Sequence, residues 1–462
     1  MSRKIQHIIV VGCGLHFRER YYSVLQQQAG IKISMVIDLE AEEERILRFF
    51  SGKSLLPEQY VFLPDEHRND LTPEQLDSLL CGRINKKLID AVIICTEPKA
   101  HKAYAIWAVR NNLHVFTDKP LTAFSSRQSS ESLLQDFYDI TEEIRNDQLN
   151  FVISCERRAH TGYNYVRQFL SDLISTYRVP VTFIDIHFGG GMWNMPDELF
   201  YRENHPYKYG YGVMLHSGYH YIDLLFSLMS LNKILYPDMH ASTLHALEIS
   251  PADHLGMIDQ TVYERCLRTD RFSEYFLPEN ISRLHDFGET DVTLTGDFKS
   301  NGKRISHYCL KLMETSASNR GWHQLPENTY ISNGRLRQES VIIHVGPLCS
   351  VHINSHSLSK QQSADKTEHF TIEIINNTSV TGRTGYIQLN RQDLTELYPE
   401  LPLNKGMNVA ARQWQLQDFL QGGDAHSSLL SHREGIAFID KVYRQLQTNM
   451  KYDNAANERI HV

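Results

Sequence analysis

Two glycines near the start of the chain are the first residues whose type and spacing could do chemistry. Gly12 and Gly14 belong to the stretch GCGLHF, which directly follows an apolar run and precedes a stretch with helical spacing. Glycines between a strand and a helix let the backbone turn tightly and approach a pyrophosphate, whose charge the helix N-terminus then meets. We therefore expect this loop, with Leu15 and His16, to bind a dinucleotide. Glycine-rich turns also occur for structural reasons, and Phe17 stands where the motif has a third glycine.

A carboxylate follows the second apolar run. Asp38 comes directly after residues 33–37, which the pattern predicts to be the second strand. At that position it would accept hydrogen bonds from the ribose hydroxyls of the dinucleotide and repel a 2′-phosphate. Because no Arg follows immediately, NAD is favoured over NADP. An Asp that caps the next helix is the competing interpretation, and the residues alone leave both open.

The elements that must position these residues alternate regularly through the first third of the chain. Helices are predicted at 18–28, 40–50, 101–111 and 130–146. Strands are predicted between them at 8–11, 33–37, 59–63, 91–95, 114–117 and 151–154. This alternation is typical of a parallel sheet, so residues 1–154 are predicted to form a doubly wound Rossmann domain. Thr96 and Pro98 would then lie where the crevice opens, although a simple proline turn has the same pattern.

The pattern changes beyond residue 155. Several runs there alternate with period two and predict strands at 181–187, 292–295, 307–314, 340–345, 350–355 and 370–375. One helix is predicted at 219–231, and two closing helices lie within 407–447. Residues 155–462 are therefore predicted to form an α+β domain with a large, mostly antiparallel open sheet. Residues 235–290 have no clear pattern and could be an insertion.

Length, charge and cysteine usage exclude several classes of protein. At 462 residues two domains are expected, and 41% hydrophobic with 22% charged residues indicate a folded globular chain. A net charge of −8 argues against a general binder of nucleic acid. The seven cysteines include no CxxC pair, and no apolar stretch approaches the roughly 18 residues of a membrane helix. We therefore expect a cytoplasmic protein with reduced cysteines and no membrane partner.

Several motifs of the chain together resemble one family. In the first domain they are Gly12-x-Gly14, Asp38, Thr96-x-Pro98-x-x-His101 and Asp118-Lys119-Pro120. Their order and spacing are similar to those of the glucose–fructose oxidoreductase/inositol dehydrogenase (Gfo/Idh/MocA) family, which typically has Glu-Lys-Pro at the last motif. In the second domain, Arg158 lies in a Cys-Glu-Arg-Arg segment that is similar to the opening of the family's C-terminal domain. Residues 210–223 resemble the family's Gly-Gly-Gly…Asp-x-Gly-x-His-x-x-Asp stretch.

The resemblance implies an enzyme that transfers hydride between a nicotinamide and a secondary alcohol or ketone of a sugar, cyclitol or related polyol. Lys119 would orient or protonate the substrate oxygen, and His220 would be the general acid/base. Both residue types suit this chemistry, because the alcohol loses its proton as hydride leaves and an ammonium stabilises the alkoxide. The resemblance also assigns residues to a cofactor site, namely Thr96, Pro98, His101, Asp118 and Lys119. It assigns others to a substrate site, namely Arg158, His216 and Asp223.

His216 departs from the family, which usually has Asp at that position. A His could still hold the substrate or share a proton, so we include it with the catalytic residues, but it does not supply the same fixed negative charge. If the helix at 219–231 extends backwards, His216, His220 and Asp223 lie at i, i+4 and i+7 on one face. That spacing also fits a metal pair or histidines packed at a domain interface. We predict no metal, because the usual partner pattern is missing.

Four aromatic and polar residues precede the His220 segment and could line a sugar pocket. Aromatic faces stack on sugar C–H surfaces while Arg binds hydroxyls, although ordinary loop anchoring explains such residues equally well. They are Trp193, Tyr201, Arg202 and Tyr211. The expected partners are a small polyol or sugar-derived substrate and a second copy of the chain, because the family often associates through its C-terminal sheet. Two alternatives stay open: a non-catalytic NAD-binding sensor, and an enzyme that uses tightly held NAD for elimination or glycoside cleavage.

Overall fold

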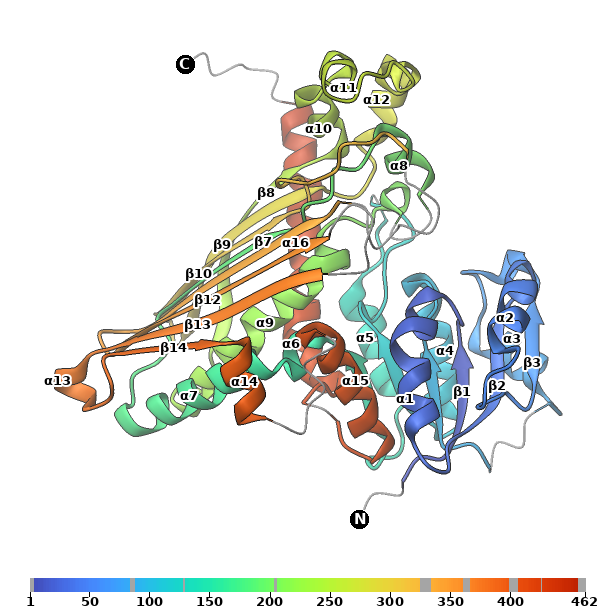
Figure 1. Cartoon of the computed structure of the whole chain (residues 1–462), viewed down its shortest axis with the longest axis horizontal. Helices are drawn as coiled ribbons and strands as arrows, with labels where there is room; N and C mark the ends of the chain where they lie inside the picture. The colour runs from blue at the N-terminus through green and yellow to red at the C-terminus, as the bar shows by residue number, and fades with distance from the viewer. Residues whose placement is uncertain are drawn as a thin grey trace. The chain divides into compact units, whose positions relative to one another are not determined.

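The structure is a computed structural model that describes residues 4–83, 88–127, 129–202, 206–324, 334–359, 366–398, 406–424 and 426–455 (Figure 1). The chain divides into two compact units. Unit 1 comprises Met1–Ala123, Glu131–Thr161 and Glu400–Ile436. Unit 2 comprises Phe124–Ser130, Gly162–Pro399 and Ala437–Val462. One sheet lies in each unit, and the predicted α/β fold class is confirmed.

Unit 1 is built on a six-stranded sheet in which every neighbouring pair is parallel. Its strands, in spatial order, are β3 (Tyr60–Leu63), β2 (Lys32–Leu39), β1 (His7–Val11), β4 (Ala91–Ile94), β5 (His114–Asp118) and β6 (Phe151–Ser154). The chain runs outwards from β1 in both directions. The carboxyl ends of β1, β2 and β4 therefore meet at the switch point of a doubly wound sheet, where ligands of this architecture bind.

Helices surround this sheet and share its core. They include the π-helical turn η1 (Phe17–Tyr21) and the α-helices α1 (Tyr22–Gln27), α2 (Glu43–Phe50), α3 (Pro73–Leu80), α4 (Pro98–Arg110), α5 (Leu133–Glu142), α6 (Glu156–Ala159) and α15 (Met407–Leu420). Leu416, Phe419 and Leu420 of α15 are buried in the same hydrophobic cluster as Phe116 and Val152. The aromatic rings of Phe116 and Phe419 are 5.4 Å apart. A segment from the end of the chain thus completes the core of the first domain.

Unit 2 contains an eight-stranded sheet that is antiparallel except between β7 and β10. In spatial order its strands are β14 (Tyr386–Asn390), β13 (Lys366–Asn376), β12 (Cys349–Ser359), β11 (Leu336–Val345), β7 (Phe183–Gly189), β10 (Lys303–Met313), β9 (Asp291–Ser300) and β8 (His240–Ile249). The sequence pattern did not predict β8 or β14. Both are edge strands, whose side chains need not alternate as regularly as those of a buried strand.

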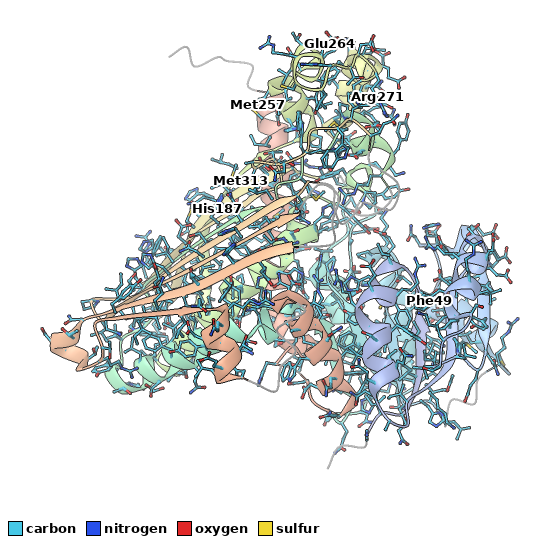
Figure 2. The ribbon with its side chains drawn as sticks, in the orientation of Figure 1. Phe49, His187, Met257, Glu264, Arg271 and Met313 are labelled. Carbon is cyan, nitrogen blue, oxygen red and sulfur yellow. The ribbon has the colours of Figure 1, made fainter. Side chains whose placement is uncertain are left out.

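One face of this sheet packs against helices. The ring of Phe188 on β7 stacks on Tyr221 of α9 (Tyr219–Met229), and Tyr308 on β10 contacts Phe438 of α16 (Arg433–Ala455). The opposite face bears the alternate residues of the strands, which include the partly exposed His187 and Met313 (Figure 2). This arrangement is the one-sided burial that period-two alternation predicts.

Residues 235–290 are an ordered part of unit 2. They form the edge strand β8, followed by α10 (Pro251–Met257), α11 (Gln260–Leu267) and α12 (Pro278–Leu284). These helices gather with α8 (Pro196–Tyr201) at one end of the sheet, where Met257, Glu264 and Arg271 lie (Figures 1 and 2). They share a separate aromatic cluster, which includes Phe200, Tyr207, Tyr263, Phe272 and Tyr275.

Helix hydropathy and cysteine state can be given for the described part of the chain. None of its helices combines the length and the apolar character needed to cross a membrane. All seven cysteines lie within it as free thiols.

Candidate active site

Gly12 directly follows β1 and packs against the backbone that follows β4. Its φ is +81°, and a Cβ at this position would lie 2.7 Å from the carbonyl carbon of Cys95 and 2.8 Å from the nitrogen of Thr96. The Gly12 N–H donates to the carbonyl oxygen of Ile37 at 2.9 Å. The ends of β1, β2 and β4 therefore meet so closely that only glycine fits.

Gly14 differs from Gly12, because a Cβ there would meet nothing within 4 Å. Its carbonyl oxygen accepts the N–H of Arg18 at 3.1 Å, so the loop leads directly into the π-helical turn η1. Phe17, which replaces the third glycine of the motif, is fully buried in the core of unit 1 and does not occupy the space over Gly14. Leu15 is 42% exposed beside the loop.

Asp38 is bonded to the glycine loop. One carboxylate oxygen accepts the N–H of Cys13 at 2.6 Å, and the other accepts the N–H of Leu39 at 2.8 Å. Burial raises the pKa of Asp38, while the hydrogen bond from Cys13 acts in the opposite direction. The short helix that follows, Glu40–Glu42, has no side-chain cap, so the structure does not support the helix-cap interpretation.

His101 joins two of the loops at this edge of the sheet. Its ring nitrogens lie 3.1 Å from the carbonyl oxygen of Thr96 and 3.0 Å from that of Pro120. The ring is fully buried, and this burial lowers the pKa of His101. Pro98 occupies the first turn of α4, where its fixed φ suits helix initiation. His101 thus positions the backbone around Thr96 and Pro120.

An acid and a base stand next to each other at the end of β5. The Tyr21 hydroxyl donates to Asp118 at 2.6 Å, and Nε2 of His16 lies 3.5 Å from the same oxygen. Lys119 follows and is joined to Pro120 by a cis peptide bond. Burial, together with the positive charge of Arg412, lowers the pKa of Lys119 to about 8. Lys119 is therefore still largely protonated near pH 7.

Arg412 belongs to a buried ion cluster that sequence reasoning missed. It lies on α15, and its guanidinium is 2.5 Å from the carboxylate of Glu156. Glu156 also contacts Arg157 at 3.1 Å, and Arg157 donates to the side chain of Asn408 at 2.6 Å. The negative charge of Glu156 raises the pKa of Lys119, in opposition to Arg412. No local pattern could reveal a pair separated by so much of the chain.

Arg158 is engaged in the same unit. Its guanidinium donates to the carbonyl oxygen of His426 at 2.9 Å, and to the hydroxyl and carbonyl oxygens of Ser431 at 2.8 Å and 3.0 Å. The side chain is buried. In this structure Arg158 therefore attaches the returning C-terminal segment to unit 1.

His216, His220 and Asp223 lie in unit 2. All three side chains are buried, and His220 and Asp223 both belong to α9. The helix extends backwards only through a π turn, η6 (Met214–Gly218), in which His216 has φ −78° and ψ −105°, outside the helical range. The expected i, i+4, i+7 face therefore does not run through a continuous α-helix. The ring of Tyr207 packs edge-on at 5.4 Å from that of His216.

The four residues expected to line a sugar pocket have different surroundings. Trp193 stacks on Tyr263 in the aromatic cluster of unit 2, at 5.7 Å between ring centres. Arg202 donates to the side chain of Asn194 at 3.1 Å. Tyr211 is buried and Tyr201 is 68% exposed. No group of three or more His, Cys, Asp and Glu side chains in the described parts of either unit is arranged to hold a metal.

Comparison with known proteins places the first domain in a family. Residues 6–135 match the family model described as "Oxidoreductase family, NAD-binding Rossmann fold". The Gfo/Idh/MocA resemblance is confirmed. The match lies in the first domain, which is similar to the NAD-binding Rossmann domain of that oxidoreductase family. A search of curated proteins finds no match to the chain.

Solved structures extend the likeness of fold to the whole chain. An oxidoreductase from Agrobacterium radiobacter, in complex with NAD+, L-tartaric acid and magnesium, has a TM-score of 0.55 at 12% identity, covering 99% of this chain and 98% of its own. Apo scyllo-inositol dehydrogenase from Lactobacillus casei has a TM-score of 0.53 at 13% identity, covering 97% and 98%. A 3-ketoreductase from Actinomadura kijaniata, in complex with NADP and TDP-benzene, has a TM-score of 0.53 at 12% identity, covering 95% and 97%.

Proposed function

We propose that this protein is an NAD-dependent oxidoreductase acting on a secondary alcohol or ketone of a sugar, cyclitol or related polyol. The observation that carries the proposal lies in unit 1. The Gly12–Gly14 loop, the carboxylate of Asp38 bonded to that loop, and Lys119 with its lowered pKa all lie at the carboxyl ends of strands of one parallel sheet. Dinucleotides bind at this edge of doubly wound sheets.

The residues present fit a dinucleotide. The space over Gly14 leaves room for a pyrophosphate beside the start of η1, with Gly12, Leu15 and His16 completing the loop. Asp38 would bind the ribose hydroxyls, and its negative charge favours NAD over NADP. NAD supplies the acceptor or donor of hydride.

The roles of the protein's own residues follow from their charge. The ammonium of Lys119 would donate a hydrogen bond from Nζ to the substrate oxygen and stabilise negative charge on it. During oxidation a ring nitrogen of His220 would accept the hydroxyl proton, and during reduction it would return that proton. His216, at the kinked turn before α9, would hold the substrate.

The test compares two site variants with matched controls. Lys119→Ala and His220→Ala should each lower kcat by at least about a hundredfold, with the Kd of NADH within twofold of the natural protein. Lys102→Ala removes a lysine that bridges Asp136 and Asp139, and His254→Ala removes another buried histidine; both should retain activity. Full activity of both site variants would refute the assignment.

The same assay separates the two alternatives. Absorbance of reduced nicotinamide should rise in step with product. Product without accumulation of NADH would instead indicate elimination or glycoside cleavage with NAD retained. Binding of NADH without turnover of any polyol or sugar would favour the non-catalytic sensor.

We also propose that a second copy of the chain docks on the face of the unit 2 sheet that bears His187 and Met313. The support is the one-sided burial of that sheet, since the partly exposed Ile342 of β11 also belongs to this face. Sedimentation should show that Met313→Asp with Ile342→Asp dissociates the oligomer. A natural protein that sediments as a monomer would refute this proposal.

A further inference from the structure

Three segments of unit 2 pack closely together just before the turn that carries His216. A Cβ on Gly210 would lie 2.6 Å from the nitrogen of Arg127, and one on Gly212 would lie 2.1 Å from the carboxyl carbon of Glu289. A Cβ on Gly288 would lie 2.2 Å from the nitrogen of Gly212. These glycines, which carry no side chain, let segments that are distant in sequence approach closely and leave room for the Glu289 carboxyl.

Glu289 lies at the centre of this contact and is completely buried. Its backbone oxygen accepts the N–H of Val213 at 2.8 Å, and its Oε1 accepts the N–H of Met214 at 3.0 Å. Both donors stand at the start of η6, where helical N–H groups have no partner within the helix. A carboxylate there both satisfies a donor and interacts favourably with the helix dipole.

Neighbouring side chains hold Glu289 in turn. The hydroxyl of Tyr443, on α16, donates to the same Oε1 at 3.1 Å. The buried Arg127 donates to the carbonyl oxygen of Phe287 at 2.8 Å and forms an ion pair with Glu248. Gln447 donates to the carbonyl oxygen of Arg127 at 2.7 Å. The start of η6 is therefore bonded to a buried polar cluster that reaches β8 and α16.

Such a cluster is costly, because each buried carboxylate must be compensated by charge and hydrogen bonds. A packing role alone would be met by apolar residues of similar size. The cluster fixes the position of the Met214 N–H. Met214 lies two residues before His216 and six before His220. The position of that N–H sets where the chain turns at His216 and where α9 begins.

We infer that Glu289 is a positioning residue for His216 and His220, acting through its hydrogen bond to the N–H of Met214. The inference rests on the proposed function for the catalytic role of the two histidines, but the placement of their rings can be measured without turnover. Tyr443 and Arg127 support Glu289 and have no direct part in the reaction.

The experiment uses the whole protein with NAD+ bound and follows the ring resonances of ¹⁵N-labelled histidine. His216 and His220 are assigned from His216→Gln and His220→Gln. Glu289→Gln should shift or broaden both resonances, lower kcat on the most active polyol of a panel containing myo-inositol, D-glucose and glycerol by about tenfold or more, and leave the Kd of NAD+ within twofold.

Asp291→Asn is the matched control. Asp291 is another buried carboxylate, two residues along the chain, but it accepts its hydrogen bonds from Thr315. This variant should leave both histidine resonances in place. If Glu289→Gln does not fold, Tyr443→Phe removes only the hydroxyl that holds Oε1 and should displace the same resonances by a smaller amount, with a two- to threefold fall in kcat.

The outcomes separate the inference from the function on which it rests. Unchanged histidine resonances in a folded Glu289→Gln, or in Tyr443→Phe when the first variant does not fold, would overturn the inference whatever the activity. An equal displacement in Asp291→Asn would overturn it as well, because the effect would then follow from the loss of any buried carboxylate in this segment. Displaced resonances in a protein that oxidises no member of the panel would support the positioning role and count against the proposed function.

Discussion

The replacement of Glu289 by Gln should change how the stability of the protein depends on pH. Burial raises the pKa of Glu289 from its ordinary 4.5 to about 7, against the lowering effect of Arg127 and of the Met214 amide. The other groups that face it are Glu248, which raises its pKa, and the Tyr443 hydroxyl. The native protein therefore binds this proton more tightly than the unfolded chain does.

This difference in proton affinity sets the sign and the size of the pH dependence of the free energy of unfolding. When a folded-state pKa is raised, the stabilising contribution is complete below the unfolded pKa and is lost as pH rises through the folded pKa. Here the loss falls between pH 4.5 and about 7. A pKa of about 7 in the folded protein against 4.5 in the unfolded chain corresponds to about 3 kcal/mol in the free energy of unfolding. Glutamine carries no titrating proton, so its contribution to the free energy of unfolding does not change with pH over this range.

The assay is urea denaturation of both proteins at half-unit steps from pH 5 to 8, followed by tryptophan fluorescence. The difference in the free energy of unfolding between Glu289→Gln and the natural protein should change by about 2–3 kcal/mol in favour of the variant between pH 5 and pH 8. Tyr443→Phe keeps the acid, so it should be less stable at every pH but retain the natural slope. Parallel curves for the natural protein and Glu289→Gln would refute the reasoning.

Three further predictions concern unit 1. The rate of carbonyl reduction should fall as pH rises above about 8, because Lys119 then loses its proton. Lys119→Met should remove this fall from the pH profile. A fall that persists in the variant would show that another group causes it. Gly12→Ala should lower the thermal midpoint sharply because its Cβ meets the Cys95 backbone, whereas Gly14→Ala should fold normally but bind NADH at least about tenfold more weakly, as fluorescence titration can check. Asp38→Ala should raise the ratio of NADP to NAD affinity. Asp90→Ala is the control, because Asp90 also accepts backbone N–H groups, at the other end of β1. Each variant should lose about 1–3 kcal/mol in the free energy of unfolding, but Asp90→Ala should leave the affinity ratio unchanged. An equal change of the ratio in both variants would count against a contact between Asp38 and the ribose.

The sequence alone determined the features that depend on local pattern. Alternating apolar and helical stretches predicted the parallel sheet of unit 1, because each strand is buried on both faces and each helix on one. The glycine spacing predicted the loop after β1, because the backbone conformation at Gly12 excludes any side chain. Asp38 could be singled out because it directly follows the predicted second strand, whereas Lys119 was singled out only by the resemblance of Asp118-Lys119-Pro120 to the family's motif.

The tertiary structure alone decided which distant residues meet. The return of α15 to unit 1 places Arg412 against Glu156, and the approach of α16 places Tyr443 against Glu289. Neither pair has a periodicity or a spacing that sequence could reveal, since a polar residue gains its role from what packs around it. The kink at His216 likewise depends on two backbone donors: the N–H of Met214 bonds to Glu289, and the N–H of His216 bonds to Gly212. Buried N–H groups must find acceptors, and here one acceptor comes from a distant segment.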